Sequence, residues 1–334
     1  MNYKEEKITI GDIADALGIS KTTVSRAISG KGRIGSETVQ RVQEYIKEHD
    51  YRPNPLAKGL ANARTYNLAW VMPGDSEVTD LPFFQRCMIG ISEAASERDY
   101  DVIMSLVYDD DMASLVRIVK NHKVDGVILG RTLVKDERIE YLKSQGIPFV
   151  AIGSCSYDNV IQVDNDHLKA CSEFTGALVL KGFKNLSLIG GMSTHMVNQS
   201  RKRGFEEGLE TNKLAVEKKN IYMDCISDSA INRAVEDVLK KNIDCIVCMD
   251  DRICSQVLEH LRNLRIEMPA DIKVASMYNS VLLDNVVPAI TAINYDPKEL
   301  GYEACKVILN KISGEEVALK TLMGYNILMR GSTN

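Results

Sequence analysis

Short apolar segments alternate with amphipathic ones from residue 66 onward, and this rhythm restricts the fold more than any other feature. Strand-like segments cover residues 67–72, 101–106, 126–130 and 149–153, and the helix-like segments between them cover 83–98, 112–121 and 137–144. Strands alternating with helices predict a parallel, doubly wound α/β sheet. The rhythm restarts after Val163-Asp164-Asn165, with strands near 186–190, 221–226, 243–249 and 273–277. We therefore expect two α/β lobes.

The first 50 residues follow a different, all-helical pattern. Thr9 can cap a first helix, whose apolar stripe consists of Ile10, Ile13, Ala14 and Leu17. Gly18 suits the left-handed conformation that ends a helix. Ser20 can cap a second helix, with Val24, Ala27 and Ile28 facing inward and Lys21, Thr22, Ser25 and Arg26 facing outward. Two short helices around such a turn are typical of a helix-turn-helix, although an ordinary helical hairpin gives the same pattern.

A third helix and a conditional one complete this region. Lys31 and Arg33 lie in a glycine-rich loop where they can meet phosphates. Ser36 is then expected to cap a helix with Val39, Val42 and Ile46 on its apolar stripe. Asn54 and Pro55 can start a fourth helix of about nine residues, which is too short to be stable alone in water. We expect that segment to become helical only when a partner holds it.

Charge and composition limit the possible partners and location. Residues 1–65 contain 11 Lys/Arg and 8 Asp/Glu, whereas the rest contains 30 and 38, so a basic head precedes an acidic body. That asymmetry favours a nucleic-acid-binding head on a body that does not bind nucleic acid. The N-terminus has no basic-then-apolar signal sequence, and no apolar run approaches the roughly 20 residues of a membrane span. We expect a cytoplasmic protein without membrane contact.

The eight cysteines indicate neither a metal site nor a disulfide framework. Cys245 and Cys248 form a CxxC pair, but they lie on a predicted buried strand, where residues three apart point to opposite faces. No second CxxC supplies the remaining ligands of a zinc site. We therefore expect reduced, buried thiols, no metal and no cofactor.

The segment from Ile8 to Arg64 resembles the headpiece and hinge of the LacI/GalR family of bacterial transcription regulators. The resemblance rests on the capped first helix, Val24-Ser25-Arg26, Tyr51-Arg52-Pro53-Asn54 and Leu56-Ala57-Lys58-Gly59-Leu60. It implies a homodimer on a palindromic operator, with Leu60 wedged into the minor groove at the central base step. The implied DNA-binding residues are Thr9, Ser20, Lys21, Thr22, Thr23, Ser25, Arg26, Arg33, Asn54, Ala57 and Leu60.

The remainder resembles the two-lobed, periplasmic-binding-protein-like (type I) sensor of the same family. Matching features are Val163-Asp164-Asn165, Arg201-Lys202-Arg203-Gly204-Phe205, Met249-Asp250-Asp251, Pro288-Ala289-Ile290-Thr291 and Met329-Arg330-Gly331-Ser332-Thr333. We therefore expect a small all-α headpiece at 1–53, a hinge at 54–65, and an effector-binding and dimerisation domain at 66–334. Within that domain the N-lobe spans about 66–162 and 293–320, and the C-lobe about 163–292 and 321–334.

Candidate ligand-binding residues follow the predicted strands, because ligands of open α/β sheets lie beyond the carboxyl ends of the strands. They are Asp75, Phe83, Phe84, Arg131, Arg201, Asp250, Asp251 and Tyr278. Asp251 could instead cap the next helix, Phe83 could belong to the core, and Arg131 could form a surface ion pair. Many family members carry an aspartate where this chain has Tyr278, so their ligands cannot be transferred. A sugar or a sugar phosphate fits the set.

Three functions remain to be separated. The resemblance implies an effector-controlled transcription regulator, most simply a repressor of carbohydrate-utilisation genes. A solute-binding protein of a transport system shares the sensor fold but has no DNA-binding head. An enzyme is disfavoured, because the sequence lacks a phosphate-binding Gly-rich loop, G-x-S-x-G and H-E-x-x-H. His195-Met196-Val197 follows a strand and could line the cleft, but no nucleophile is indicated beside it.

Overall fold

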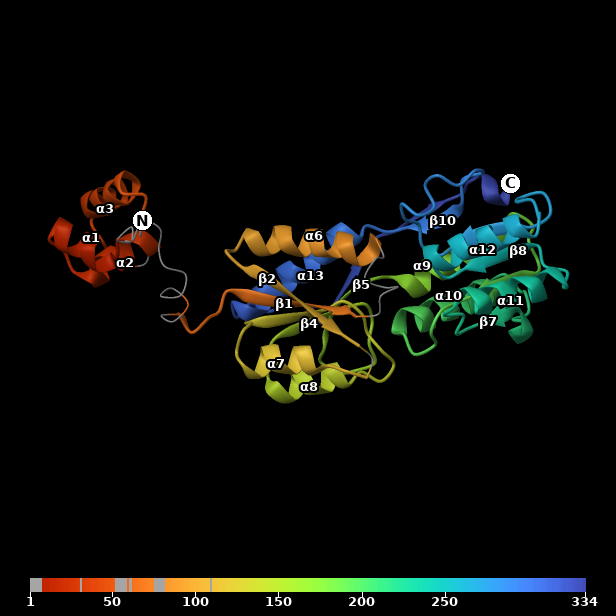
Figure 1. The fold of residues 1–334 in the computed structure, drawn as a ribbon, viewed down its shortest axis with the longest axis horizontal. Coiled ribbons are helices and arrows are strands. Elements are labelled where there is room, and N and C mark those ends of the chain that lie inside the picture. The colour runs from red at the N-terminus through yellow and green to blue at the C-terminus, as the bar shows by residue number, and fades with distance from the viewer. Residues whose placement is uncertain (1–7, 31, 52–58, 60–61, 75–81, 109) are drawn as a thin grey trace, which may run out of the picture. The chain divides into compact units, whose positions relative to one another are not determined.

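The computed structural model describes residues 8–30, 32–51, 59, 62–74, 82–108 and 110–334 (Figure 1). The chain divides into two compact units, residues 1–65 and 66–334. In the part that the structure describes, no helix combines the length and the apolar character needed to cross a membrane.

The headpiece contains three helices, α1 (Ile10–Leu17), α2 (Lys21–Ser29) and α3 (Ser36–Glu48). Thr9 caps α1 in a reciprocal box, since its hydroxyl accepts from the Asp12 N–H and the Asp12 carboxylate accepts from the Thr9 N–H at 2.8 Å. Gly18 ends α1 with a φ of 66°, in the left-handed region. The helices close over a core of Ile13, Ala14, Val24, Ala27, Val42 and Tyr51.

One expectation about the headpiece is wrong. Gly35, not Ser36, occupies the N-cap position of α3, and Ser36 is its first helical residue. Glycine is also accepted at N-caps, so α3 begins there without a side-chain cap.

The N-lobe of residues 66–334 is built on a parallel six-stranded sheet in the order β11-β5-β4-β3-β1-β2. Its strands are β1 (Asn67–Pro73), β2 (Asp101–Val107), β3 (Gly126–Leu129), β4 (Phe149–Ile152), β5 (Ile161–Asn165) and β11 (Lys320–Met323). Along β1, Leu68, Trp70 and Met72 enter one core and Ala69 and Val71 enter the other, as the alternation of strand side chains requires.

Each face of this sheet is covered by a pair of helices (Figure 1). Helices α6 (Pro82–Ser96) and α13 (Pro297–Ile312) supply Phe84, Ile91, Leu300 and Ile308 to one core. Helices α7 (Ala113–Lys120) and α8 (Glu137–Gln145) supply Leu115, Ile118, Ile139 and Leu142 to the opposite core. The result is the doubly wound arrangement expected from the sequence.

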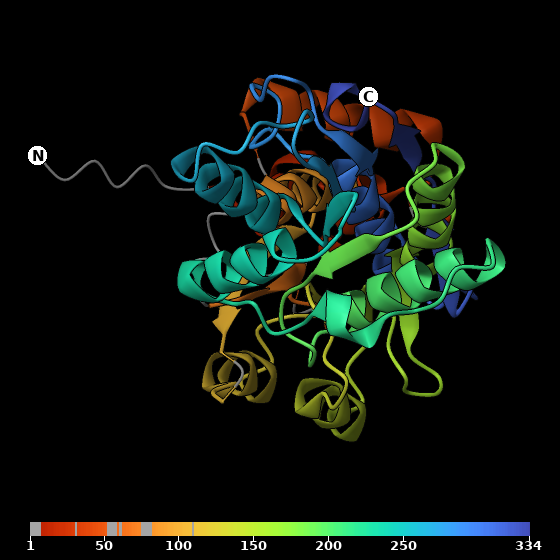
Figure 2. The ribbon, with the colours of Figure 1, turned by 90° about the vertical axis from the view of Figure 1, so that its right-hand side faces the viewer.

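The C-lobe, which faces the viewer in Figure 2, repeats the plan around a second sheet. The strands of this sheet follow the order β12-β10-β9-β8-β6-β7. Its strands are β6 (Leu186–Ile189), β7 (Ile221–Tyr222), β8 (Cys245–Cys248), β9 (Lys273–Ser276), β10 (Thr291–Asn294) and β12 (Asn326–Leu328), the last antiparallel to β10. Helix α9 (His167–Leu180) packs against α10 (Met196–Thr211), and α11 (Asp228–Leu239) packs against α12 (Asp251–Asn263). Two short 3-10 turns lie at Lys218–Asn220 and Gly331–Thr333.

The chain crosses between the lobes a few residues later than the approximate limits from the sequence. The strands β5 and β11 belong wholly to the first sheet, and β10 belongs wholly to the second. The crossovers therefore follow Asn165, Asn294 and Met323, because each strand finishes in its own sheet before the chain leaves it.

All eight cysteines are free thiols. The described residues hold no group of three or more His, Cys, Asp or Glu arranged for a metal ion.

Candidate functional site

A cavity of about 640 Å³ lies between the two lobes. It is lined by residues at or just beyond the carboxyl ends of strands in both sheets, including Gly130, Gly153, Asp164, Gly191 and Asp250. This is where open α/β sheets bind ligands, and the volume is typical of a site for a small molecule.

Most of the sequence-predicted ligand residues lie in this cavity. They are Phe83, Phe84, Arg131, Arg201, Asp250, Asp251 and Tyr278. Asp75 lies outside the described residues. His195 and Val197 also line the cavity, as their position after a strand suggested.

Arg201 projects from α10 into the cavity and is held from two sides. Its Nη1 donates to the Met249 carbonyl at 2.8 Å, and its guanidinium carbon lies 5.9 Å from the centroid of the Tyr278 ring. Only 8% of Arg201 is exposed, and its buried Nε has no hydrogen-bond partner among the described residues. A buried donor without a partner is costly, so Nε is suited to a ligand acceptor.

The two adjacent aspartates have different roles. Asp250 is the N-cap of α12, since its Oδ1 accepts from the Ile253 N–H at 2.8 Å. The alternative that Asp251 caps this helix is therefore wrong. Asp251 is 3% exposed, and its Oδ2 has no partner among the described residues. Burial and the neighbouring Asp250 carboxylate raise the pKa of Asp251 to about 6.

An aromatic wall borders these polar groups. The Tyr278 ring stacks on Tyr295, with an interplanar angle of 16° and a centroid distance of 6.2 Å, and meets Phe83 edge-on at 6.0 Å. Phe83 also packs against the cores of both lobes, so this residue contributes to the core and lines the cavity at the same time. Aromatic faces of this kind can contact the C–H side of a sugar ring.

The structure adds polar cavity residues that were not selected from the sequence. Asp164 and Asn165 end β5 and line the cavity, and the buried Asn165 Oδ1 has no partner among the described residues. Burial raises the pKa of Asp164 to about 7. His167 Nδ1 lies 3.2 Å from the Tyr295 hydroxyl, and burial holds the pKa of His167 well below its usual range. The strand-end rule could have found Asp164 and Asn165, whereas His167 required the fold.

The headpiece presents the polar surface that the sequence indicated. Lys21, Thr22, Ser25 and Arg26 are exposed on α2, and Arg33 is exposed in the following loop. The hydroxyls of Thr9 and Ser20 accept the capping hydrogen bonds of α1 and α2, and the Thr23 hydroxyl lies 2.8 Å from that of Ser20. Arg41, not selected from the sequence, donates to the Leu17 carbonyl at 3.2 Å and fixes the end of α1. The remaining candidates, Asn54, Ala57 and Leu60, lie outside the described residues.

Family comparison agrees with this two-part construction. The model of "Bacterial regulatory proteins, lacI family" matches residues 9–54. The model of "Periplasmic binding proteins and sugar binding domain of LacI family" matches residues 67–324, which is more than half of the chain. The chain belongs to the LacI family. As a LacI-family protein it is a DNA-binding transcription regulator. A transport role is excluded, because solute-binding proteins do not carry the helix-turn-helix matched at residues 9–54.

Several LacI-family relatives match nearly the whole chain. The transcriptional regulator MalR of Streptococcus pneumoniae is 27% identical, over 96% of this chain and 99% of MalR. Catabolite control protein A of Staphylococcus aureus is 25% identical, over 98% and 99%. Among solved structures, the probable maltose operon repressor MalR of Staphylococcus aureus has a TM-score of 0.75 at 26% identity, covering 81% of this chain and 98% of that one. The lac repressor dimer bound to operator shares the fold, with a TM-score of 0.79 at 19% identity over 98% and 99%.

Proposed function

We propose that this LacI-family regulator represses carbohydrate-utilisation genes and responds to a sugar or sugar phosphate in the interlobe cavity. Two polar atoms in the cavity support the proposal most directly: Arg201 Nε is a buried donor and Asp251 Oδ2 is a buried acceptor, and both lack hydrogen-bond partners among the described residues. A donor and an acceptor beside an aromatic ring suit the hydroxyls and the C–H face of a sugar. A probable maltose operon transcriptional repressor is among the similar solved structures.

The choice between a neutral sugar and a sugar phosphate depends on charge. Arg131, Arg201 and Arg252 line the cavity together with Asp164, Asp250 and Asp251. A thermal-shift screen should compare maltose, cellobiose and glucose with glucose 6-phosphate and maltose 6-phosphate. A ligand at 100 times its Kd stabilises the folded state by about 2.7 kcal/mol, so a true effector gives a clear shift in melting temperature. No shift with any sugar would remove the sugar part of the proposal.

DNA binding should be specific, dimeric and controlled by the effector. We propose that Lys21, Thr22, Ser25 and Arg26 contact bases or phosphates of each half-site, and that Leu60 kinks the centre of a palindromic operator. A gel-shift titration on a palindromic operator, with and without the sugar from the screen, tests this. Leu60→Ala should reduce DNA bending without changing the affinity of the sugar, and unchanged bending would refute the wedge.

Homodimerisation is supported by exposed apolar side chains on both lobes. Met88 and Ile89 of α6 and Met104 and Leu106 of β2 are 36–55% exposed on the N-lobe. On the C-lobe, Val281, Leu282 and Val287 are exposed. Apolar patches on a soluble protein indicate interaction sites. Light scattering should give a dimer, and a monomer at micromolar concentration would contradict it.

We propose that the protein acts by binding, without catalysis, on chromosomal DNA in the cytoplasm.

A further inference from the structure

One stretch of the N-lobe, residues 131–136, runs from the cavity to the C-lobe, and we call it the rim segment. It begins with Arg131, which lines the cavity, and Leu133 pairs with His195 of the C-lobe in an antiparallel bridge. The Val134 N–H donates to the Thr194 carbonyl at 2.9 Å, and the Met196 N–H donates to the Thr132 carbonyl at 3.1 Å. These backbone hydrogen bonds, which we call the rim contact, therefore join the two lobes beside the ligand cavity.

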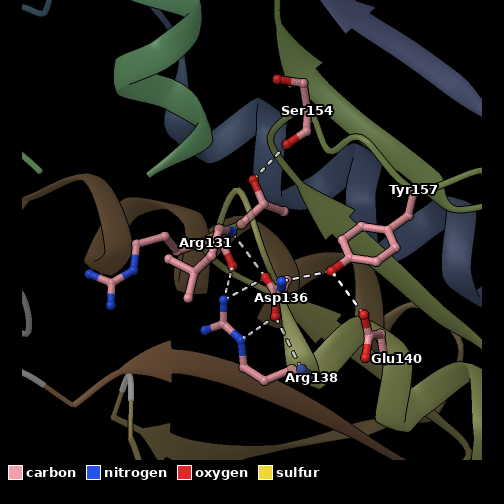
Figure 3. Close-up of polar contacts among 8 residues, drawn as sticks. Arg131, Asp136, Arg138, Glu140, Ser154 and Tyr157 are labelled. Carbon is pink, nitrogen blue, oxygen red and sulfur yellow. Dashed lines mark hydrogen bonds and ion pairs between the residues drawn. The ribbon is translucent and has the colours of Figure 1, made fainter. Parts of the chain in front are cut away.

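The rim segment is held by a buried ion pair, Asp136 with Arg138 (Figure 3). Asp136 is completely buried and Arg138 is 6% exposed. Arg138 Nε donates to Asp136 Oδ1 at 2.7 Å, and its Nη2 donates to Oδ2 at 2.6 Å. This two-point contact between guanidinium and carboxylate fixes both side chains in one geometry.

The pair directs its remaining hydrogen bonds at the backbone of the rim segment. Asp136 Oδ2 accepts from the Leu133 N–H at 3.0 Å, and Arg138 Nη2 donates to the Arg131 carbonyl at 3.1 Å. Figure 3 shows the Arg131 side chain extending away from the ion pair while its carbonyl meets Arg138. The pair thus touches the main chain of a cavity residue, although neither Asp136 nor Arg138 lines the cavity.

The loop after β4 supports the same segment from a second side. The Tyr157 hydroxyl accepts from the Asp136 N–H at 2.8 Å, and the Thr132 hydroxyl donates to the Ser154 carbonyl at 2.6 Å. Ser154 Oγ in turn lies 3.3 Å from Ser200 Oγ on α10, the C-lobe helix that carries Arg201. Both sides of the rim contact are therefore connected to arginines of the cavity.

We propose that Asp136 and Arg138 are positioning residues of the effector cleft. They hold Arg131 at the cavity and keep the rim segment in register with residues 194–196, so that the two lobes close together. The importance of this arrangement for ligand response rests on the proposed function, whereas the closure itself does not require an effector. The ion pair acts through Arg131 and the rim segment, not by touching the ligand.

Met196→Pro tests the rim contact with little disturbance elsewhere. Met196 is the first residue of α10, where proline is favoured, and the preceding His195 is already extended with φ −83° and ψ 126°. The substitution deletes the N–H that bonds to the Thr132 carbonyl. Met196→Ala is the matched control, because it shortens the side chain and keeps the N–H.

Hydrogen exchange of the full-length protein without any sugar gives the readout. In Met196→Pro, we expect the Val134 amide to exchange roughly 2- to 10-fold faster than in Met196→Ala, the change expected on losing one neighbouring hydrogen bond. Amides of β8 should be unchanged. Equal exchange of Val134 in both variants would overturn the role of the rim contact.

Arg138→Lys tests the ion pair, since lysine keeps the charge but loses the planar fork of donors. Peptides covering 131–136 and 192–196 should exchange faster, while Arg117→Lys, at an exposed arginine on α7, should change neither. Faster exchange limited to 131–136 would show that the pair does not position the lobes. These outcomes need no effector, so a failed sugar screen and a failed positioning role are distinguishable.

Discussion

The guanidinium of Arg201 lies over the ring of Tyr278, with 5.9 Å between the guanidinium carbon and the ring centroid. The same guanidinium donates to the Met249 carbonyl, so Arg201 is fixed before a ligand arrives. A side chain fixed in advance loses little conformational entropy on binding, which favours affinity. Tyr278 therefore supports Arg201 through its ring rather than through a charge.

Arg201→Ala should weaken effector binding by roughly 10- to 100-fold, the usual effect of losing a hydrogen bond from a charged group. Isothermal titration of the full-length protein with the sugar from the screen measures this. Arg203→Ala is the control, because Arg203 lies on the same helix but is exposed and pairs with Glu207 at 3.4 Å. Equal losses in the two variants would contradict a direct role for Arg201.

Asp251 should make the stability of the sensor domain depend on pH. Its pKa is raised from 3.8 to about 6, mainly by burial, so the folded chain retains this proton at a higher pH than the unfolded chain. The protonated form favours folding. That contribution is complete below pH 4 and is lost as pH rises through about 6. Asp251→Asn cannot ionise and should gain stability over the wild type with rising pH, by at most about 3 kcal/mol at pH 7.

Urea titrations of both proteins at pH 4.5 and 7.5 check this prediction. Trp70 is the single tryptophan of the chain and is fully buried in β1, so its fluorescence reports the unfolding of the sensor domain alone. The difference in the free energy of unfolding between Asp251→Asn and the wild type should be larger at pH 7.5. The same difference at both pH values would show that Asp251 does not titrate in this range.

Arg26→Ala should reduce operator binding by roughly 1–3 kcal/mol per half-site if its guanidinium forms a bidentate contact with a guanine. Arg26 is exposed on the outer face of α2, opposite the buried Val24 and Ala27. Gel shifts on the operator and on random DNA of equal length separate the two kinds of contact. Similar losses on both DNAs would make Arg26 a phosphate contact instead.

The local features of the fold could be read from the sequence, because caps and alternation act over a few residues. Thr9, Ser20 and Gly18 stand at the helix ends where their chemistry placed them. Such reasoning places the start of a helix only to within about one residue. Ser36 and Gly35 are both acceptable N-caps, and only the path of the loop selects Gly35.

The cleft was less predictable, because its chemistry depends on which groups the lobes bring together. Asp250 and Asp251 are indistinguishable in the sequence. In the structure Asp250 caps α12, whereas Asp251 Oδ2 has no hydrogen-bond partner among the described residues. The ion pair of Asp136 and Arg138 gave no sequence signal at all. Both residues are charged and near a helix start, which ordinarily means a solvated surface.

Breaking that buried pair should be strongly destabilising. Arg138→Met leaves the Asp136 carboxylate buried without its cation, and we expect the free energy of unfolding to fall by about 3–5 kcal/mol. Asp136→Leu should lower the free energy of unfolding by a similar amount, because it leaves the Arg138 guanidinium buried without its carboxylate. The double variant should lose less than the sum of the two, by about 0.5–3 kcal/mol, because it leaves no unpaired charge. Trp70 fluorescence in urea measures all three, and strictly additive losses would mean that the two charges do not stabilise each other.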